Sequence, residues 1–153
     1  MVNLLLKLRA LATRAGWLPP LLVRIVLGIV FIQSGWGKLH DIPGTTEHFA
    51  DWHIPFPHFN AVLASGTELL GGLAIFFGLG TRLAALPLTF VMCVAIASAK
   101  WPGLETWGDF FGWDETAYAA MFLWLATAGA GAISLDHLIA RRWLDPKAGE
   151  SKT

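Results

Sequence analysis

The chain has 153 residues, of which 55% are hydrophobic and only 14% are charged, and its mean hydropathy is +0.55. Soluble domains carry about 25% charged residues, so this composition excludes an ordinary soluble domain and indicates an integral membrane protein. The formal net charge of zero excludes nucleic-acid binding by bulk electrostatics, and the single cysteine, Cys93, excludes an intramolecular disulfide and a cysteine metal cage.

Residues 1–18 form the first predicted element, an amphipathic helix that lies in the membrane interface. Leucines recur through this segment, and basic side chains such as Lys7 and Arg9 can contact anionic headgroups. We assign residues 19–138 to a membrane domain and residues 139–153 to a basic cytoplasmic tail.

Four apolar segments follow within the membrane domain, and each approaches the roughly twenty residues that a helix needs to cross ~30 Å of hydrocarbon. They cover residues 21–37, 59–79, 82–99 and 116–133. A spanning segment must satisfy its own backbone groups, so all four are predicted to be helices. The predicted fold is therefore all-α, an integral membrane four-helix bundle with an N-terminal amphipathic interfacial helix.

The basic residues predict the orientation of these segments. In a four-span chain they fall on one side, apart from Lys38 and Lys100 at segment ends. They are Lys7, Arg9, Arg14, Arg82, Arg141, Arg142, Lys147 and Lys152. The two opposite loops, 39–58 and 101–115, are acidic. We therefore expect both termini to be cytoplasmic, in a multi-pass protein of the bacterial inner membrane.

Glu68 is the outstanding polar residue, because it lies near the middle of the second segment. An ionised carboxylate at that depth costs at least ~2.5 kcal/mol, so it should face the bundle interior. Ser65 shares its helix face, and Gln33 and Lys38 of the first segment come within reach if the two helices are antiparallel. Glu68 is either a proton-accepting or ligand-binding carboxylate or an interhelical hydrogen-bond acceptor that fixes packing.

Three further charged residues are expected at the cytoplasmic side. Arg24 lies about one turn inside the first segment, where a long basic side chain can snorkel to the headgroups. Arg82 lies at the short turn between the second and third segments. Asp136, just after the fourth segment, is on the same side and within possible pairing distance of either arginine.

The first outer loop is rich in histidine, with His40, His48, His53 and His58 among aromatic residues. The last three are five residues apart, which does not match the i, i+4 spacing of a helical metal pair. Neutral imidazoles can still converge on Cu or Zn through loop folding. The alternative is an interfacial loop whose amphipathic rings lie among the headgroups.

Three runs carry a resemblance to a known family: RIVLGIVFIQSGWGKL (24–39), ELLGGLAIFFGLGTRLAA (68–85) and SLDHL (134–138). Together they resemble the DoxX family of small four-helix membrane proteins, over roughly residues 20–138. The resemblance places five residues at the characteristic polar positions of the family. They are Arg24, Lys38, Glu68, Arg82 and Asp136.

The resemblance implies a link to membrane redox chemistry. Relatives are similar to a subunit of thiosulfate:quinone oxidoreductase, others are associated with oxidative-stress and sulfur-handling complexes, and more distant kin include a methylamine-dehydrogenase maturation factor. The chain departs from the family pattern in its histidine-rich outer loop and in the Trp-rich acidic loop that follows Lys100. These departures leave a metal-related role open.

Three functional hypotheses follow. In the first, the chain is a quinone-linked redox subunit with Glu68 and Lys38 as catalytic residues, and the electrons come from a redox partner protein or a bound small molecule. The candidate ligand-binding residues are Gln33, Arg24, Ser65, Arg82 and Asp136. In the second, the chain is a membrane scaffold that docks a partner; in the third, it is a metal-handling accessory that uses the outer histidines. A homo-oligomer is compatible with all three.

Overall fold

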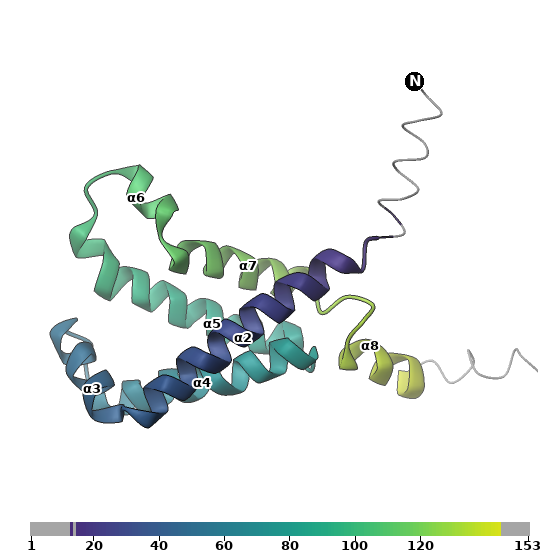
Figure 1. Cartoon of the computed structure of the whole chain (residues 1–153), viewed down its shortest axis with the longest axis horizontal. Coiled ribbons are helices and arrows are strands. Elements are labelled where there is room, and N and C mark those ends of the chain that lie inside the picture. The colour runs from purple at the N-terminus through teal and green to yellow at the C-terminus, as the bar shows by residue number, and fades with distance from the viewer. Residues whose placement is uncertain (1–12, 14, 145–153) are drawn as a thin grey trace, which may run out of the picture.

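The computed structural model describes residue 13 and residues 15–144, and this part of the chain is helical, without strands (Figure 1). The predicted interfacial segment 1–18 therefore lies mostly outside the described residues, as does the tail from residue 145. Four longer helices are α2 (Leu18–His40), α4 (Pro57–Phe77), α5 (Thr81–Ala95) and α7 (Asp114–Ala128). Shorter ones are α3 (Ile42–Asp51), α6 (Trp107–Gly112) and α8 (Leu135–Ile139). A π-helical turn, Ile96–Lys100, continues α5.

Three helical stretches of the described part are long and apolar enough to cross a membrane. They are Leu18–His40, Pro57–Phe77 and Thr81–Gly103. The fourth predicted helix, 116–133, is shorter than expected, because α7 ends at Ala128 after 15 residues, or about 22 Å. Gly129 follows with φ +83°, a backbone conformation that stops a right-handed helix.

Helices α2 and α4 pack backbone to backbone. A β-carbon at Gly35 of α2 would lie 2.7 Å from the carbonyl oxygen of Ser65, and one at Gly72 of α4 would lie 2.8 Å from the backbone nitrogen of Ile32. Membrane helices associate through such close approaches of small residues, since lipid tails supply no hydrophobic drive between helices. The glycines therefore set how near the polar side chains of the two helices come.

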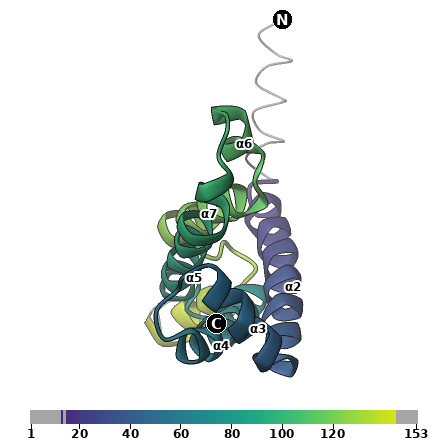
Figure 2. The ribbon, with the colours of Figure 1, turned by 90° about the vertical axis from the view of Figure 1, so that its left-hand side faces the viewer.

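Helices α5 and α7 form a second packed pair, and α4 also contacts α5. Figure 2 looks along the bundle, with α2 on one side and α5 and α7 on the other. Phe31 of α2 joins the two pairs, because its ring meets those of Phe122 and Tyr118 edge to face, with centroids 4.8 and 5.5 Å apart. The buried core contains Leu27, Phe31, Ile75, Ala85, Leu88, Met92, Phe122 and Leu125.

The turn between α4 and α5 is closed by Gly78. The amide of Gly78 donates to the Ile75 carbonyl and that of Leu79 to the Ala74 carbonyl, the paired bonds of a Schellman motif. Gly78 has φ +69°, and a β-carbon there would collide with the Arg24 guanidinium. Only glycine fits this position, and the turn brings α5 back antiparallel to α4.

Candidate functional site

Glu68 lies in the middle of α4 with only 1% of its side chain exposed, and its carboxylate accepts three hydrogen bonds. Lys38 Nζ donates to Oε1 at 2.6 Å and to Oε2 at 2.8 Å. The Ser34 hydroxyl donates to Oε2 at 2.8 Å. An ionised pair in a membrane interior is tolerated when both charges are paired and hydrogen-bonded. The Glu68 carboxylate meets this condition through its bonds to Lys38 and Ser34.

The sequence places these side chains by helix geometry. Ser34 and Lys38 are four residues apart, so they lie one above the other on the same face of α2. Gly35 lies beside them and lets α2 approach the Ser65–Leu69 turn of α4, which carries Glu68 on the facing side. Lys38 is 34% exposed, so it connects the buried carboxylate with the surface near the start of α3.

A cavity of about 800 Å³ lies between the α2–α4 pair and the α5–α7 pair, and Glu68 is in its wall. Its lining is mainly apolar, with residues from α2, α4, α5, α7 and the segment that follows α3. Aromatic and aliphatic members include Phe31, Phe49, Trp52, Leu63, Phe90, Val91, Met92 and Tyr118. A mainly apolar pocket with a few convergent polar groups is the usual form of a small-molecule site.

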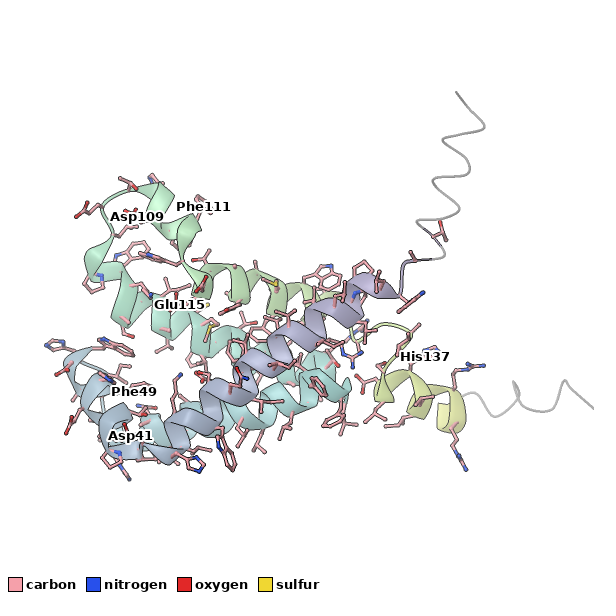
Figure 3. All side chains as sticks on the ribbon, in the orientation of Figure 1. Asp41, Phe49, Asp109, Phe111, Glu115 and His137 are labelled. Atoms are coloured by element: carbon pink, nitrogen blue, oxygen red, sulfur yellow. The ribbon has the colours of Figure 1, made fainter. Side chains whose placement is uncertain are left out.

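A second ion pair lines the same cavity. Lys100 Nζ, at the end of the π-helical turn, lies 3.4 Å from Glu115 Oε1 in the first turn of α7. Figure 3 labels Glu115 at this end of α7 and Phe49 on α3, and both residues line the cavity. Sequence reasoning noted Lys100 as a basic residue at a segment end and as a departure from the family pattern, and it did not propose Glu115 or Ser34 as site residues. The four-residue spacing of Ser34 and Lys38 was a usable signal for Ser34.

Two predicted ligand-binding residues of α2 and α4 lie away from the described lining of the cavity. Gln33 is exposed, because it occupies the helix position next to Ser34 and so points to another face of α2. Ser65 is fully buried at the contact with α2, and its hydroxyl donates to the Ala61 carbonyl at 2.6 Å. The structure therefore brings Glu68 together with Lys38 and Ser34 rather than with Gln33.

Arg24 does not snorkel; it is 2% exposed and donates to four backbone carbonyls. Its Nε bonds Ile75 at 2.9 Å and its Nη2 bonds Phe76 at 2.9 Å, both in the last turn of α4. Its Nη1 bonds Ala130 at 3.0 Å and Ile133 at 2.6 Å, in the segment after α7. The expectation of a snorkelling side chain was wrong, because these carbonyls, left free by helix ends, offer buried acceptors.

Asp136 caps α5. Its carboxylate accepts from the amides of Gly80 at 2.6 Å and Thr81 at 3.0 Å, two donors that the start of the helix leaves free. Arg82 is exposed and lies against Gly129, where a β-carbon would be 3.1 Å from its Nε. The two residues thus lie at the end of the bundle that holds Arg24, far along α4 from Glu68.

The four outer-loop histidines are all exposed. His40 packs on Trp36, with ring centroids 4.3 Å apart, and His48 stacks on Trp52 at 6.1 Å. Nδ1 of His58 lies 3.5 Å from the Thr46 hydroxyl, and His53 takes a left-handed backbone conformation with φ +56°. Within the described residues, no three His, Cys, Asp or Glu side chains gather as a metal site would require.

A protein-family model described as DoxX matches residues 20–101, more than half of the chain. The chain belongs to the DoxX family. The matched region contains Arg24, Lys38, Glu68 and Arg82, while Glu115 and Asp136 lie beyond it. The family assignment thus covers the Glu68 pair but only the lysine of the second ion pair.

Other DoxX-like proteins are similar over most of their length. The Escherichia coli inner membrane protein YqjF is 32% identical over 80% of this chain and 93% of its own, and inner membrane protein YphA of the same organism is 32% identical over 76% and 86%. The Bacillus subtilis protein named "Putative oxidoreductase CatD" is 31% identical over 78% and 85%. No solved structure matches the chain. This DoxX chain is therefore a membrane protein, similar to proteins of bacterial inner membranes.

Proposed function

We propose that this DoxX protein is a quinone-linked subunit of a membrane oxidoreductase. The observation that carries the proposal is the buried Glu68 carboxylate, bonded to Lys38, in the wall of a mainly apolar cavity. A quinone headgroup is a flat apolar ring with oxygens that accept hydrogen bonds when oxidised and donate them when reduced. The Lys38 ammonium serves the first state as a donor, and the Glu68 carboxylate serves the second as an acceptor.

The size and lining of the cavity support a ligand of this kind. Its volume of about 800 Å³ falls within the roughly 300–1,000 Å³ of small-molecule pockets. Phe31, Phe90 and Tyr118 offer ring faces and edges to a flat molecule, and desolvation by such walls strengthens the polar contacts at Glu68.

The chemistry assigns one proton-handling group to the chain. Reduction of a quinone to a quinol consumes two electrons and two protons. In this proposal the electrons come from a redox partner protein or from a bound small molecule. Glu68 takes up each proton from the outer water that reaches Lys38 and passes it to a ring oxygen, and the reverse reaction returns the protons by the same route. The word oxidoreductase in the name of the Bacillus relative agrees with this role.

We also propose four membrane crossings with both termini cytoplasmic. At about 22 Å, α7 alone is too short for a ~30 Å core, but the segment 129–134 continues its path. Irregular backbone at membrane depth is tolerated where protein buries it and satisfies its polar groups. Arg24 does so for the carbonyls of Ala130 and Ile133, which supports a fourth crossing completed by this segment.

Binding of a reduced quinone to the purified protein in mild detergent tests the proposal. We choose the quinol form of 2,3-dimethyl-1,4-naphthoquinone, kept reduced so that its hydroxyl groups can donate to the Glu68 carboxylate, and Glu68→Gln as the variant. A hydrogen bond to a charged group is worth about 1.5–3 kcal/mol, so the Kd should rise about 10- to 100-fold. Glu47→Gln, an exposed carboxylate on α3, is the matched control and should bind as wild type does.

The scaffold hypothesis is the alternative, and one observation favours it: Lys38 and Ser34 already satisfy the Glu68 carboxylate. Under that hypothesis Glu68→Gln binds the quinol as the wild type does, or neither protein binds it, while assembly with a partner is unchanged. A wild-type protein that carries no quinone after extraction and does not bind the added probe contradicts the proposed redox role.

A further inference from the structure

The polar groups of the cavity are concentrated in two places. One is Glu68 with Lys38, which bridges α4 and α2. The other is Glu115 with Lys100, which bridges α7 and the π-helical turn that continues α5. Since the cavity lies between the α2–α4 pair and the α5–α7 pair, the two ion pairs belong to different walls.

The second ion pair is incomplete. The Glu115–Lys100 separation of 3.4 Å is longer than the 2.6 Å of Lys38 and Glu68, and it involves only Oε1. Oε2 of Glu115 is buried and has no hydrogen-bond partner among the described residues. A buried carboxylate oxygen without a donor is costly, and such atoms in native structures call for an explanation such as a ligand.

The local backbone also points to a site. Ile96–Lys100 forms a π-helical turn, and such turns are frequent at functional sites. Ser98 and Lys100, both from this turn, line the cavity, as does Tyr118, one helical turn after Glu115. A phenol, an ammonium and a carboxylate with a free oxygen thus line the cavity from the side of α5 and α7.

We propose that Lys100 and Glu115 form a second ligand-binding pair, which selects a ring with polar groups at two opposite ends. In this arrangement Lys38 and Lys100 donate to the two carbonyl oxygens of a 1,4-quinone, and Glu68 and Glu115 accept from the two hydroxyl groups of its quinol. Fatty acids and other molecules with one polar end engage only one pair. The inference rests on the proposed quinone site and deepens it, because it names the ligand class that the cavity prefers.

The test compares two probes of similar size. One is 2,3-dimethyl-1,4-naphthoquinone, with two opposed carbonyl groups, and the other is 2,3-dimethyl-1-tetralone, with a single one. The variant is Lys100→Met with Glu115→Gln, which removes both charges together and so leaves no unpaired charge in the wall. Glu105→Gln, an exposed carboxylate of the same loop, is the matched control.

We expect wild type and the Glu105→Gln control to bind the diketone at least about tenfold more tightly than the monoketone. The double variant should lose this preference, with the Kd of the diketone raised about tenfold and that of the monoketone within about twofold of wild type. Unchanged monoketone binding also reports an intact cavity. Lys100→Met alone, which removes the group that donates to the second carbonyl oxygen, replaces the double variant if that protein does not fold.

Two results overturn the inference, and they differ. If wild type binds both probes and the double variant keeps the wild-type preference, the second pair is not a ligand anchor, while the quinone site stands. If wild type binds neither probe, the result contradicts both the proposed function and the inference that rests on it. Equal affinity of wild type for the two probes also contradicts a two-ended site.

Discussion

Lys38 Nζ lies 2.6 Å from Oε1 and 2.8 Å from Oε2 of Glu68, so one ammonium group bonds both oxygens of a carboxylate that is 1% exposed. The two residues differ in burial, because Lys38 is 34% exposed. Removing one partner therefore has a different consequence from removing the other.

A double-mutant cycle measures this asymmetry. Lys38→Met leaves a buried carboxylate with only Ser34 as donor and should lower the free energy of unfolding by about 3–5 kcal/mol. Glu68→Gln leaves an ammonium that can reach water and should cost less. The double variant should be more stable than Lys38→Met, with a coupling energy above about 1.5 kcal/mol in reversible unfolding in mixed micelles. Strictly additive costs contradict a direct pair.

The contact between α2 and α4 gives a second prediction with a matched control in the same helix. A methyl group at Gly35 meets the backbone of Ser65 and Leu69, whereas at Gly37 nothing lies within 4 Å. Gly35→Ala should destabilise the protein by about 1–3 kcal/mol through overpacking, and Gly37→Ala should be neutral or slightly stabilising. Thermal unfolding of both variants in the same detergent measures the difference.

Quinone binding refines the glycine experiment. Because α2 must move away from α4 to accommodate the methyl group added by Gly35→Ala, the Lys38–Glu68 distance should increase in that variant. Quinone affinity should therefore fall in Gly35→Ala and stay unchanged in Gly37→Ala. Equal stability of the two variants contradicts the backbone-to-backbone packing of these helices.

The helices of the bundle could be predicted from hydropathy. The side chains that contact one another between the helices could be predicted only in part. Apolar runs located α2, α4 and α5 to within a few residues, because a membrane requires length and internal hydrogen bonding. Glu68 and Lys38 were predicted as site residues from depth and family pattern. Gln33 was predicted to lie near Glu68, but Ser34 lies there instead. Successive residues of a helix point in directions about 100° apart, so only one of the two side chains faces α4.

The end of α7 and the role of Arg24 could not be predicted from local sequence. The Gly129–Gly131 backbone turns away from helical conformation, but glycine is common inside membrane helices and did not indicate a stop. The acceptors of Arg24 lie 51 to 109 residues away along the chain, so no local pattern predicts them. Arg24 looked like a snorkelling side chain because that is the usual behaviour near a helix end.

Substitution of Arg24 yields the third prediction. Arg24→Lys keeps the charge but cannot reach four carbonyls from two segments, since an ammonium lacks the planar fork of a guanidinium. Buried carbonyls left without donors should lower the free energy of unfolding by about 2–5 kcal/mol. Arg82→Lys, at an exposed position of the same end of the bundle, should change it by less than about 0.5 kcal/mol. Similar losses of unfolding free energy in both variants contradict the conclusion that Arg24 stabilises the fold by donating to four backbone carbonyls.

The last prediction concerns the number of membrane crossings, because α7 alone is too short to span the hydrocarbon core. Single cysteines are placed in a Cys93→Ala background at Glu47, Glu105, Arg82 and Arg141, all of them exposed positions. With four spans, an impermeant maleimide added to intact cells should label positions 47 and 105 and leave 82 and 141 unlabelled. Position 82 serves as the cytoplasmic reference, since it follows the hairpin turn.

Position 141 decides between the alternatives. If α7 only lies against α5 without crossing, the chain has three spans, and position 141 is labelled together with 47 and 105. The four-span topology requires the segment 129–134 to reach the cytoplasmic side, which depends on Arg24 satisfying its carbonyls. Combining Arg24→Met with the cysteine at 141 therefore extends the test. Increased labelling at 141 with unchanged protection at 82 is the expected result, because only the last crossing loses its buried donor.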